Sequence, residues 1–174
     1  MKIRLINPSD DPRWDDFVSR HRFGSVYHHS TWMEVIRNTF PNTTPLYFVL
    51  ENKTGELNSA IPIFLIRSWL TGNRLVSLPF SPFCDPLVDS LEDLNKLLEV
   101  ILNKSKKLKA SYLEMRVLNG FNLLNVTAFK ENSLHFWKTY RLALEKEPDL
   151  LKKSFHKTAI QQRITRAEKN LKVR

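Results

Sequence analysis

The sequence predicts an α/β (α+β) fold, a mixed β-sheet flanked by helices that ends in a basic helix. Short apolar stretches bounded by turn residues are typical of strands, and amphipathic stretches with helical spacing lie between them. The order of these elements is the third observation, because early antiparallel pairs are followed by a β-α-β step. Hydrophobic residues make up 42% of the 174 residues, so a chain of this size can bury the core of one ordinary domain.

The first two predicted elements are a short strand and a short helix. Polar and apolar residues alternate over residues 2–7, as they do on a half-buried strand. Asp10 or Asp11 is expected to cap the helix, because a carboxylate accepts hydrogen bonds from the free amides of a first turn. Pro12 would stand in that first turn, and the helix would run to about Arg20.

A second helix is predicted after Gly24 and Ser25 interrupt the pattern. Ser30 is its expected N-cap, and Pro41 and Pro45 are expected to end it. The residues that the helical spacing places on its apolar face are Trp32, Val35, Ile36 and Phe40.

Three strands and a stiff loop follow this helix. Residues 46–51 and 57–67 predict the two strands of a hairpin, with residues 52–55 as its turn. Residues 74–78 predict a third strand. Three prolines interrupt residues 79–86, and because each proline removes a ladder donor, this stretch is predicted to be a loop. A stiff loop on a rigid scaffold is expected to line any cleft that the domain has.

A long amphipathic helix, two further strands and a final helix complete the predicted chain. The long helix is expected to be capped near Ser90, and the two strands to cover residues 111–117 and 135–144. The last helix is predicted over residues 154–171. Its apolar stripe consists of Ile160, Ile164, Ala167 and Leu171. The side chains that we expect in the core are Trp32, Phe48, Ile63, Leu65, Leu97 and Leu113.

The net charge of +9 is concentrated in the final segment of the chain. Residues 152–174 contain eight Lys or Arg and one acid, Glu168, which gives +7 and leaves +2 for the rest of the protein. A basic segment favours phosphates, nucleic acid or an anionic membrane surface as its partner. The other interpretation is a solvated helix face. The candidate anion-binding residues on this helix are Lys157, Arg163, Arg166 and Lys169.

Several kinds of site lack their characteristic residues. His28 and His29 are adjacent and point apart, and no Cys, Asp or Glu stands at ligand spacing, so no metal site is predicted. The four glycines are isolated, which excludes a Walker loop and a dinucleotide fingerprint. Cys84 is the single cysteine, and packing is the preferred interpretation over nucleophilic catalysis. A reduced cytoplasm is the expected location, no apolar stretch is long enough to span a membrane, and no catalytic residue is predicted.

Several segments, taken in chain order, resemble one protein family. They are VYHHSTW at residues 26–32, PLYFVL at 45–50, RLVSLPFS at 74–81, CDPL at 84–87, YLEMR at 112–116, SFHK at 154–157 and RITRAEK at 163–169. This ordered set covers nearly the whole chain and resembles the N-terminal half of FemAB-like acyltransferases of the GNAT superfamily. The resemblance implies a GNAT-like mixed sheet.

The resemblance also implies two GNAT-like domains with different roles. Residues 1–150 would form the first domain, and residues 151–174 would form a basic helix leading to a second domain absent from this chain. In such proteins the second domain carries the donor site. No cofactor is therefore expected in this chain, and acyl-CoA or aminoacyl-tRNA would be the donor in the full protein.

A fifth candidate residue comes from the same resemblance. Relatives attach amino acids from aminoacyl-tRNA to peptidoglycan precursors, or act in exopolysaccharide pathways. In the peptidoglycan enzymes a basic residue near the helical tryptophan binds a nucleotide-sugar phosphate. The matching place here holds Ile36 with Arg37 next to it, so Arg37 is a candidate substrate-binding residue.

The expected function is therefore transfer of an acyl or aminoacyl group to an amine or hydroxyl acceptor, an envelope or exopolysaccharide precursor. The expected partners are a second GNAT-like domain and an anionic substrate or tRNA. Two alternatives stay open, a non-catalytic anion-binding module and an RNA-binding domain for tRNA. Phe155 is the only aromatic residue in the basic segment, which argues against sequence-neutral binding of single strands by base stacking.

Overall fold

The computed structural model describes residues 1–118, 142, 144 and 147–170, which fall into two compact units, Met1–Leu134 and His135–Arg174. We call the described parts of these the N-terminal unit and the C-terminal unit, and each is described by itself. The elements of the N-terminal unit are β1 (Lys2–Ile6), α1 (Trp14–Arg20), the 3₁₀-helix η1 (Val26–His28), α2 (Ser30–Thr39), β2 (Thr43–Glu51), β3 (Leu57–Ile66), β4 (Asn73–Val76), α3 (Leu91–Lys107) and β5 (Ala110–Glu114). The predicted strand at residues 135–144 lies outside the described residues, except for the isolated positions 142 and 144.

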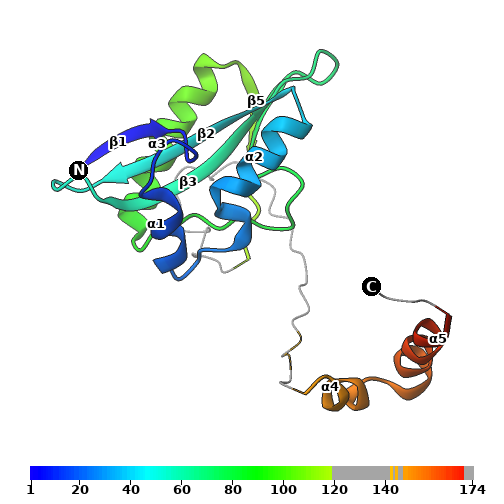
Figure 1. Cartoon of the computed structure of the whole chain (residues 1–174). Helices are drawn as coiled ribbons and strands as arrows, with labels where there is room; N and C mark the ends of the chain where they lie inside the picture. The colour runs from blue at the N-terminus through cyan, green and yellow to red at the C-terminus, as the bar shows by residue number, and fades with distance from the viewer. Residues whose placement is uncertain (119–141, 143, 145–146, 171–174) are drawn as a thin grey trace. The chain divides into compact units, whose positions relative to one another are not determined.

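The five strands form one mixed sheet in the order β1-β2-β3-β4-β5 (Figure 1). The pairs from β1 to β4 are antiparallel. Short connections join β2 to β3 and β3 to β4, whereas α1, η1 and α2 lie between β1 and β2. The pair β4–β5 is parallel, and α3 makes the crossover between the two strands. The predicted fold class, a mixed β-sheet flanked by helices, is confirmed.

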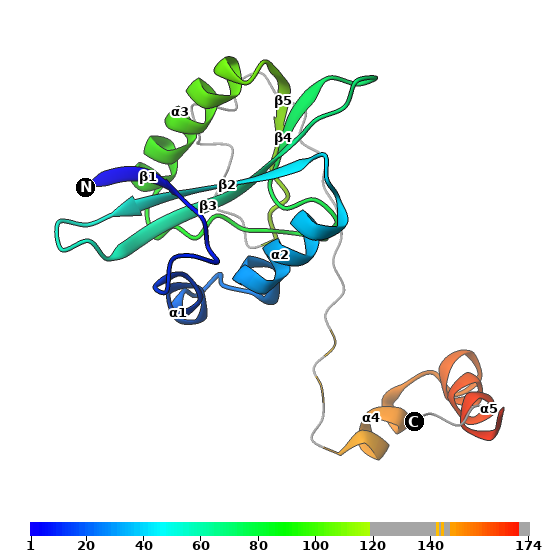
Figure 2. The same cartoon turned by 45° about the horizontal axis from the view of Figure 1, so that its top comes forward.

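Helices cover both faces of the sheet, α1 and α2 on one face and α3 on the other (Figure 2). Side chains of a strand alternate between the faces, and β2 shows this directly. Tyr47 and Val49 are buried with α1 and α2, whereas Phe48 and Leu50 are buried with α3. Each fully buried side chain of this size contributes about 1.5–3 kcal/mol to folding, so both cores are needed to hold the sheet.

The hairpin β2–β3 and helix α3 agree with the sequence prediction. Gly55 in the hairpin turn has φ +84°, a conformation that glycine adopts without strain. Ser90 is the N-cap of α3, and its hydroxyl accepts a hydrogen bond from the Asp93 amide at 3.1 Å. Among the side chains expected in the core, Phe48, Ile63, Leu65 and Leu97 are buried. Trp32 and Leu113 are only half-buried.

The starts of α1 and α2 differ from the prediction. α1 begins at Trp14. Asp11 Oδ1 accepts from the backbone amide of Arg13 at 3.1 Å, as a capping side chain would, and also from Arg13 Nε at 2.8 Å. The N-cap of α2 is His29, because the Ser30 hydroxyl donates to the Asp15 carboxylate at 2.5 Å.

The buried face of α2 is also rotated from the expected one. Met33 and Ile36 are buried, whereas Val35 is 50% exposed and Phe40 is half-buried. The predicted face therefore had one wrong member and lacked Met33.

Two features of β3 matter for the loop that follows β4. β4 pairs with β3 only from Phe64 to Ile66, so it ends beside Phe64. Ala60 forms an isolated antiparallel bridge with Leu87, with amide-to-carbonyl distances of 2.7 and 2.8 Å. Pro62 lies between these two contacts. The chain thus leaves the sheet after β4 and returns to the same edge of β3 at Leu87.

The C-terminal unit contains α4 (Pro148–Ser154), a π-helix η4 (Lys157–Gln161) and α5 (Gln162–Asn170). The helix predicted over residues 154–171 starts later, at Lys157, because Phe155 and His156 have extended backbone ψ angles of 155° and 125°. It continues through η4 and α5 to Asn170, and Leu171 lies outside the described residues. The His156 ring Nδ1 accepts from the Ala159 amide at 3.2 Å and so starts a new helical segment. No helix among the described residues is long and apolar enough to cross a membrane.

Candidate functional site

The loop of residues 77–90 follows β4 at the end of the parallel β4–β5 pair, where open α/β sheets commonly bind ligands. Leu78 and Phe80 have φ of 50° and 63°, in the left-handed region that side chains other than glycine rarely adopt. Strain of this kind persists only where surrounding contacts impose it, and it is concentrated at functional sites. The strained loop of residues 77–90 is held by contacts with η1, α2 and the residues at the end of β5.

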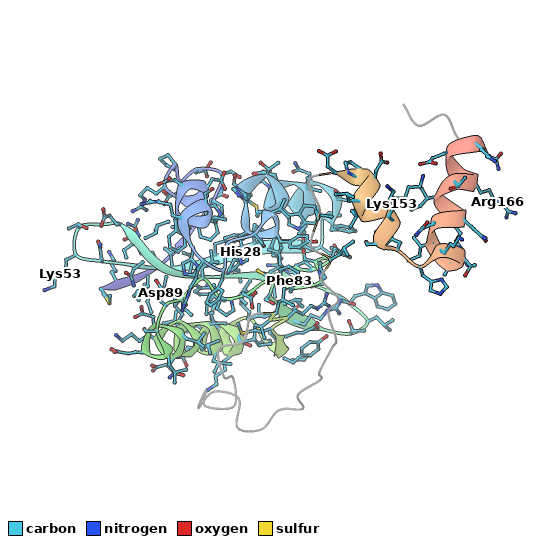
Figure 3. All side chains as sticks on the ribbon, turned by 90° about the horizontal axis from the view of Figure 1, so that it is seen from below. His28, Lys53, Phe83, Asp89, Lys153 and Arg166 are labelled. Carbon is cyan, nitrogen blue, oxygen red and sulfur yellow. The ribbon has the colours of Figure 1, made fainter. Side chains whose placement is uncertain are left out.

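His28 is the innermost of these contacts. It is fully buried, and Figure 3 shows it between the α1–α2 layer and the sheet. Its Nε2 lies 2.9 Å from the carbonyl oxygen of Asp85 and its Nδ1 lies 2.8 Å from the Ser25 hydroxyl. A carbonyl oxygen only accepts, so Nε2 carries the proton and Nδ1 accepts from Ser25. Burial lowers the pKa of His28, which keeps the ring neutral.

Cys84 lies beside the same histidine but is not arranged as a nucleophile. Its Sγ is 3.4 Å from His28 Nε2, yet that nitrogen holds its own proton and cannot take one from the thiol. Burial raises the pKa of the Cys84 thiol well above its usual range. The geometry therefore supports packing as the role of Cys84, the interpretation preferred from the sequence.

The outgoing end of β5 holds the other side of the loop. The Arg116 amide donates to Ser77 Oγ at 2.9 Å, and the Cys84 amide donates to the Arg116 carbonyl at 2.7 Å. The Arg116 guanidinium donates to the Ser81 carbonyl at 3.2 Å and to Glu114 at 2.6 Å. Asp85 Oδ1 accepts from the Leu118 amide at 2.8 Å. These bonds hold the loop of residues 77–90 against the residues that follow β5.

Aromatic side chains hold the loop against α2. Trp32 Nε1 donates to Ser81 Oγ at 3.0 Å, and Tyr27 makes edge-on contacts with both Trp32 and Phe83. The rings of Phe40 and Phe80 are stacked with centroids 3.9 Å apart. The prediction that residues 79–86 line a cleft stays a prediction, since the hollow described below is lined by other residues.

The loop of residues 77–90 lacks the glycines that usually accompany a diphosphate-binding loop. A diphosphate needs free backbone amides at a helix start, usually with glycines that let it approach. Residues 77–90 contain no glycine and three prolines, and the amides of Ser77, Cys84 and Leu87 are already bonded within the fold. The first turn of α3 carries Glu92 and Asp93, whose negative charges oppose an anion.

The C-terminal unit gathers three of the predicted basic residues around one hollow. This hollow has a volume of about 510 Å³ and is open to solvent. Its lining residues are Lys157, Gln161, Gln162, Thr165, Arg166, Lys169 and Asn170. Three cations and no acid line it, so its electrostatic potential suits an anion. Arg163 is exposed and is not part of the lining.

Contacts within the C-terminal unit give this hollow its shape. Lys152 Nζ on α4 pairs with both carboxylate oxygens of Glu168 on α5 at 2.8 Å. Gln161 Nε2 donates to the Phe155 carbonyl at 2.7 Å. The single acid of residues 152–170 is thus neutralised away from the hollow. Figure 3 shows Arg166 projecting outward from α5.

The predicted apolar stripe is only partly covered in the described unit. Ile164 and Ala167 are half-buried and Ile160 is 42% exposed, whereas Leu171 lies outside the described residues.

Arg37 belongs to α2 in the N-terminal unit, where its guanidinium pairs with the Glu34 carboxylate at 2.6 Å. Glu34 also accepts from the Ser9 hydroxyl. Of the five predicted substrate-binding residues, the structure therefore brings together Lys157, Arg166 and Lys169. Within the described ranges, no group of His, Cys, Asp and Glu side chains is arranged to hold a metal ion.

Sequence reasoning missed the contact between His28 and Asp85, and the strained loop around it. Only the tandem histidines and the three prolines marked these segments in the sequence. No spacing rule connects residues 57 positions apart, so the pairing could not be found from the pattern alone.

Comparisons with solved structures show what this fold resembles. Glucosamine-6-phosphate N-acetyltransferase from Arabidopsis thaliana matches with a TM-score of 0.53 and 18% identity, over 80% of this chain and 97% of that chain. A ribosomal-protein-alanine N-acetyltransferase from Brucella melitensis biovar Abortus 2308 matches with a TM-score of 0.52 and 10% identity, over 83% and 100%. At such identities these matches establish the fold, and the fold is GNAT-like, as the sequence predicted.

A match to FemX has a TM-score of 0.49 and 20% identity, and covers 63% of this chain. The matched region spans 25% of the FemX chain. No protein-family model matches the sequence, and no curated protein matches it significantly.

Proposed function

We propose that this chain is the GNAT-like N-terminal half of a FemAB-like acyl- or aminoacyltransferase that acts in the cytoplasm. The acceptor would be an amine or hydroxyl of an envelope or exopolysaccharide precursor. One observation carries the proposal: a GNAT-like sheet with a parallel β4–β5 pair is combined with a loop after β4 that contains three prolines and no glycine. In this proposal the donor is held by another domain.

The donor, acyl-CoA or aminoacyl-tRNA, would bind a second GNAT-like domain that follows the basic segment. The acceptor nitrogen or oxygen attacks the donor carbonyl carbon, the thiol or the tRNA hydroxyl leaves, and the acceptor gives up its proton. Positioning of the two substrates and stabilisation of the oxyanion supply most of the rate in such reactions. We assign no catalytic residue within this chain.

In this proposal the basic residues of the C-terminal unit bind the anionic part of a substrate. Lys157, Arg166 and Lys169 present three positive charges at one hollow. The guanidinium of Arg166 can bind two phosphate oxygens at once, whereas lysines act as point charges. Arg37 would contribute only after leaving its ion pair with Glu34.

Calorimetry with acetyl-CoA tests the absence of a donor site. The 174-residue chain is expected to bind acetyl-CoA only weakly, because its isolated glycines form no glycine-spaced loop that could hold the diphosphate. Saturable low-micromolar binding would place a donor site in this chain and contradict the proposal.

The coding sequence beyond Arg174 provides the second test. A continuation by about one domain, roughly 150 residues, is expected, and the longer polypeptide should bind acyl-CoA or aminoacyl-tRNA. A stop codon directly after Arg174 would instead support a self-contained module.

The second candidate function is an anion-binding or tRNA-binding module without catalysis. The hollow lined by three cations and no acid is the observation that favours it. Transfer assays on the longest natural polypeptide separate the two candidates, because only an acyltransferase consumes donor in the presence of acceptor.

A further inference from the structure

Residues 67–74, the connection between β3 and β4 with the first two residues of β4, expose two large apolar side chains. Trp69 is 95% exposed and Leu70 is 75% exposed. We call residues 67–74 the hairpin tip, and Figure 2 shows it extending beyond the rest of the sheet. Exposing a tryptophan and a leucine to water together is unfavourable by several kcal/mol relative to burying them, so an apolar pair at such a place commonly marks a contact site.

The exposure belongs to a hydrogen-bonded turn. The Gly72 amide donates to the Ser68 carbonyl at 2.9 Å, and the Thr71 amide donates to Ser68 Oγ at 3.1 Å. Gly72 has φ +75°, and a Cβ there would lie 3.3 Å from Ser111 Oγ. These bonds hold the turn in a conformation that directs Trp69 and Leu70 away from the core.

Basic residues are frequent in the hairpin tip and in the segment that pairs with its base. Asn73 pairs with Ala110, and its side chain donates to the Leu108 carbonyl at 2.9 Å, so the tip lies against the link between α3 and β5. Residues 67–74 and 100–113 contain no Asp or Glu. The six cations of these two stretches are Arg67, Arg74, Lys104, Lys106, Lys107 and Lys109.

These cations are not neutralised inside the described fold. Arg67 donates to the Thr44 hydroxyl at 2.6 Å and Arg74 donates to the Thr71 hydroxyl at 3.0 Å. Within residues 1–118, none of the six cations forms an ion pair with a carboxylate. The surface around the tip therefore carries uncompensated positive charge beside an apolar projection.

We propose that the hairpin tip docks onto an anionic membrane surface, with Trp69 and Leu70 entering the headgroup region and the surrounding cations contacting lipid phosphates. Tryptophan is enriched at membrane interfaces because its ring is amphipathic, and leucine gains from contact with acyl chains. Each Lys or Arg near an anionic leaflet adds electrostatic attraction to the lipid phosphates. The six cations therefore complement the negative charge of such a membrane.

The shape and chemistry of the tip favour a membrane over the other polyanions. A projecting pair of apolar residues fits a soft surface, whereas a protein partner would need a pocket shaped for it. Nucleic acid would use flat rings for stacking, and Leu70 provides none. The proposal is independent of the acyltransferase assignment, since it rests on the tip alone.

Binding by this mechanism has two measurable components. Partition onto vesicles should rise with the fraction of anionic lipid and fall with salt, because the cations are screened by added ions. Removal of the apolar pair should weaken binding at every salt concentration, because it takes away the inserted part.

Vesicle flotation of the full chain tests the proposal, with phosphatidylcholine alone and with phosphatidylglycerol added. The double variant Trp69→Ala/Leu70→Ala should lose about tenfold in partition onto anionic vesicles. Lys106→Gln/Lys107→Gln should lose part of the binding and part of its salt dependence. Val26→Ala, at a residue 63% exposed on η1, and Lys53→Gln, at the turn between β2 and β3, are the matched controls and should behave as wild type.

Three outcomes would overturn the proposal. The first is wild-type partition of the Trp69→Ala/Leu70→Ala variant. The second is loss of binding in Arg166→Ala/Lys169→Ala while the tip variant keeps it, which would assign lipid binding to the C-terminal unit. The third is shielding of the Trp69 side chain from solvent by an RNA oligonucleotide, with no such shielding by vesicles. Quenching of tryptophan fluorescence by brominated lipid measures the insertion directly. It should be weaker in Trp69→Phe than in wild type.

Discussion

His28 Nε2 donates to the carbonyl oxygen of Asp85 at 2.9 Å, and this bond joins η1 to the loop after β4 across 57 positions of sequence. The ring is fully buried and its other nitrogen accepts from Ser25. One neutral side chain thus connects the helical layer to the strained loop. The loop's conformation depends on this histidine remaining uncharged.

Replacing His28 by Ala should lower the free energy of unfolding by about 2–4 kcal/mol, because it leaves the buried Asp85 carbonyl and the half-buried Ser25 hydroxyl without their partner. Urea unfolding followed by circular dichroism measures this. His29→Ala is the neighbouring control, since His29 is only half-buried, and it should lose about 1 kcal/mol or less. Equal losses in both variants would contradict the role assigned to His28.

Stability should fall as the pH falls below about 6.5, the pKa of an unfolded histidine. Burial lowers the pKa of folded His28. The hydrogen bond to Asp85 and its negative charge raise the pKa by a smaller amount, and His21 and His29 lower it further. The unfolded chain therefore binds the proton first, and the stability present above pH 6.5 is lost as the pH approaches the lowered folded pKa. Burial also lowers the pKa of His21, so that residue adds to the same slope.

Chemical denaturation at about pH 7.5 and about pH 5.5 checks this dependence. The variant His28→Gln should have a flatter pH profile than wild type, and His21→Gln should flatten it less. A pH profile of His28→Gln that is as steep as wild type would show that other groups cause the acid sensitivity.

Gly24→Ala should destabilise the N-terminal unit by about 2–4 kcal/mol. A Cβ at this position would lie 1.9 Å from the carbonyl oxygen of Val18 and 3.0 Å from that of His21. Both obstacles are backbone atoms, so the turn after α1 must move. Gly55→Ala is a useful comparison, because a Cβ there meets nothing within 4 Å and only the φ of +84° opposes it. Thermal unfolding should rank Gly24→Ala as the more severe change.

Native Cys84 should react slowly with thiol reagents, and its reaction rate should rise sharply when urea unfolds the protein. Complete burial and the raised pKa of the thiol both keep the thiolate scarce in the folded state. Spectrophotometric titration with a disulfide reagent measures the rate. Rapid modification of folded protein would show that Cys84 is accessible and would reopen a catalytic role.

Arg166→Ala combined with Lys169→Ala should weaken binding of a phosphate-bearing ligand by roughly tenfold and flatten its salt dependence, because both side chains line the hollow of the C-terminal unit. Arg163→Ala is a matched control, since Arg163 lies outside the lining. Nucleotide-sugar, tRNA and an anionic glycan serve as ligands for the longest natural polypeptide. Wild-type affinity of the double variant for all three ligands, at low and moderate salt, would show that the basic helix is structural.

Local patterns predicted the fold well where one segment decides the outcome. The turn at residues 52–55 and the Ser90 cap of α3 were identified correctly, because Gly55 and Ser90 act on their immediate neighbours. Periodicity also placed Phe48, Ile63 and Leu97 in the core. The mixed sheet followed from the order of these segments.

The prediction failed where a side chain makes a contact that helical spacing does not encode. Ser30 would cap α2 by local rules, but its hydroxyl donates to the Asp15 carboxylate on α1. In the C-terminal unit, the side chain of His156 accepts from the Ala159 amide, and the last helix therefore starts at Lys157 rather than near Ser154.

The candidate site was only partly predictable for the same reason. Helical spacing grouped the basic residues of the last segment, and three of them line one hollow. Whether they bind a substrate stays a prediction. The contacts around Asp85 depend on tertiary pairing of His28 and Leu118 with it, and no local pattern encodes that.

Pro62 fixes where β4 can end. Backbone groups alternate sides along a strand, so the Pro62 nitrogen points to the same edge of β3 as the amides of Ala60 and Phe64. That nitrogen carries no hydrogen. If β4 continued its pairing by two residues, or shifted in register, a carbonyl oxygen of β4 would face Pro62 and lack a hydrogen-bond donor. The proline therefore acts as a stop for the strand, and the chain must leave the sheet and return at Leu87.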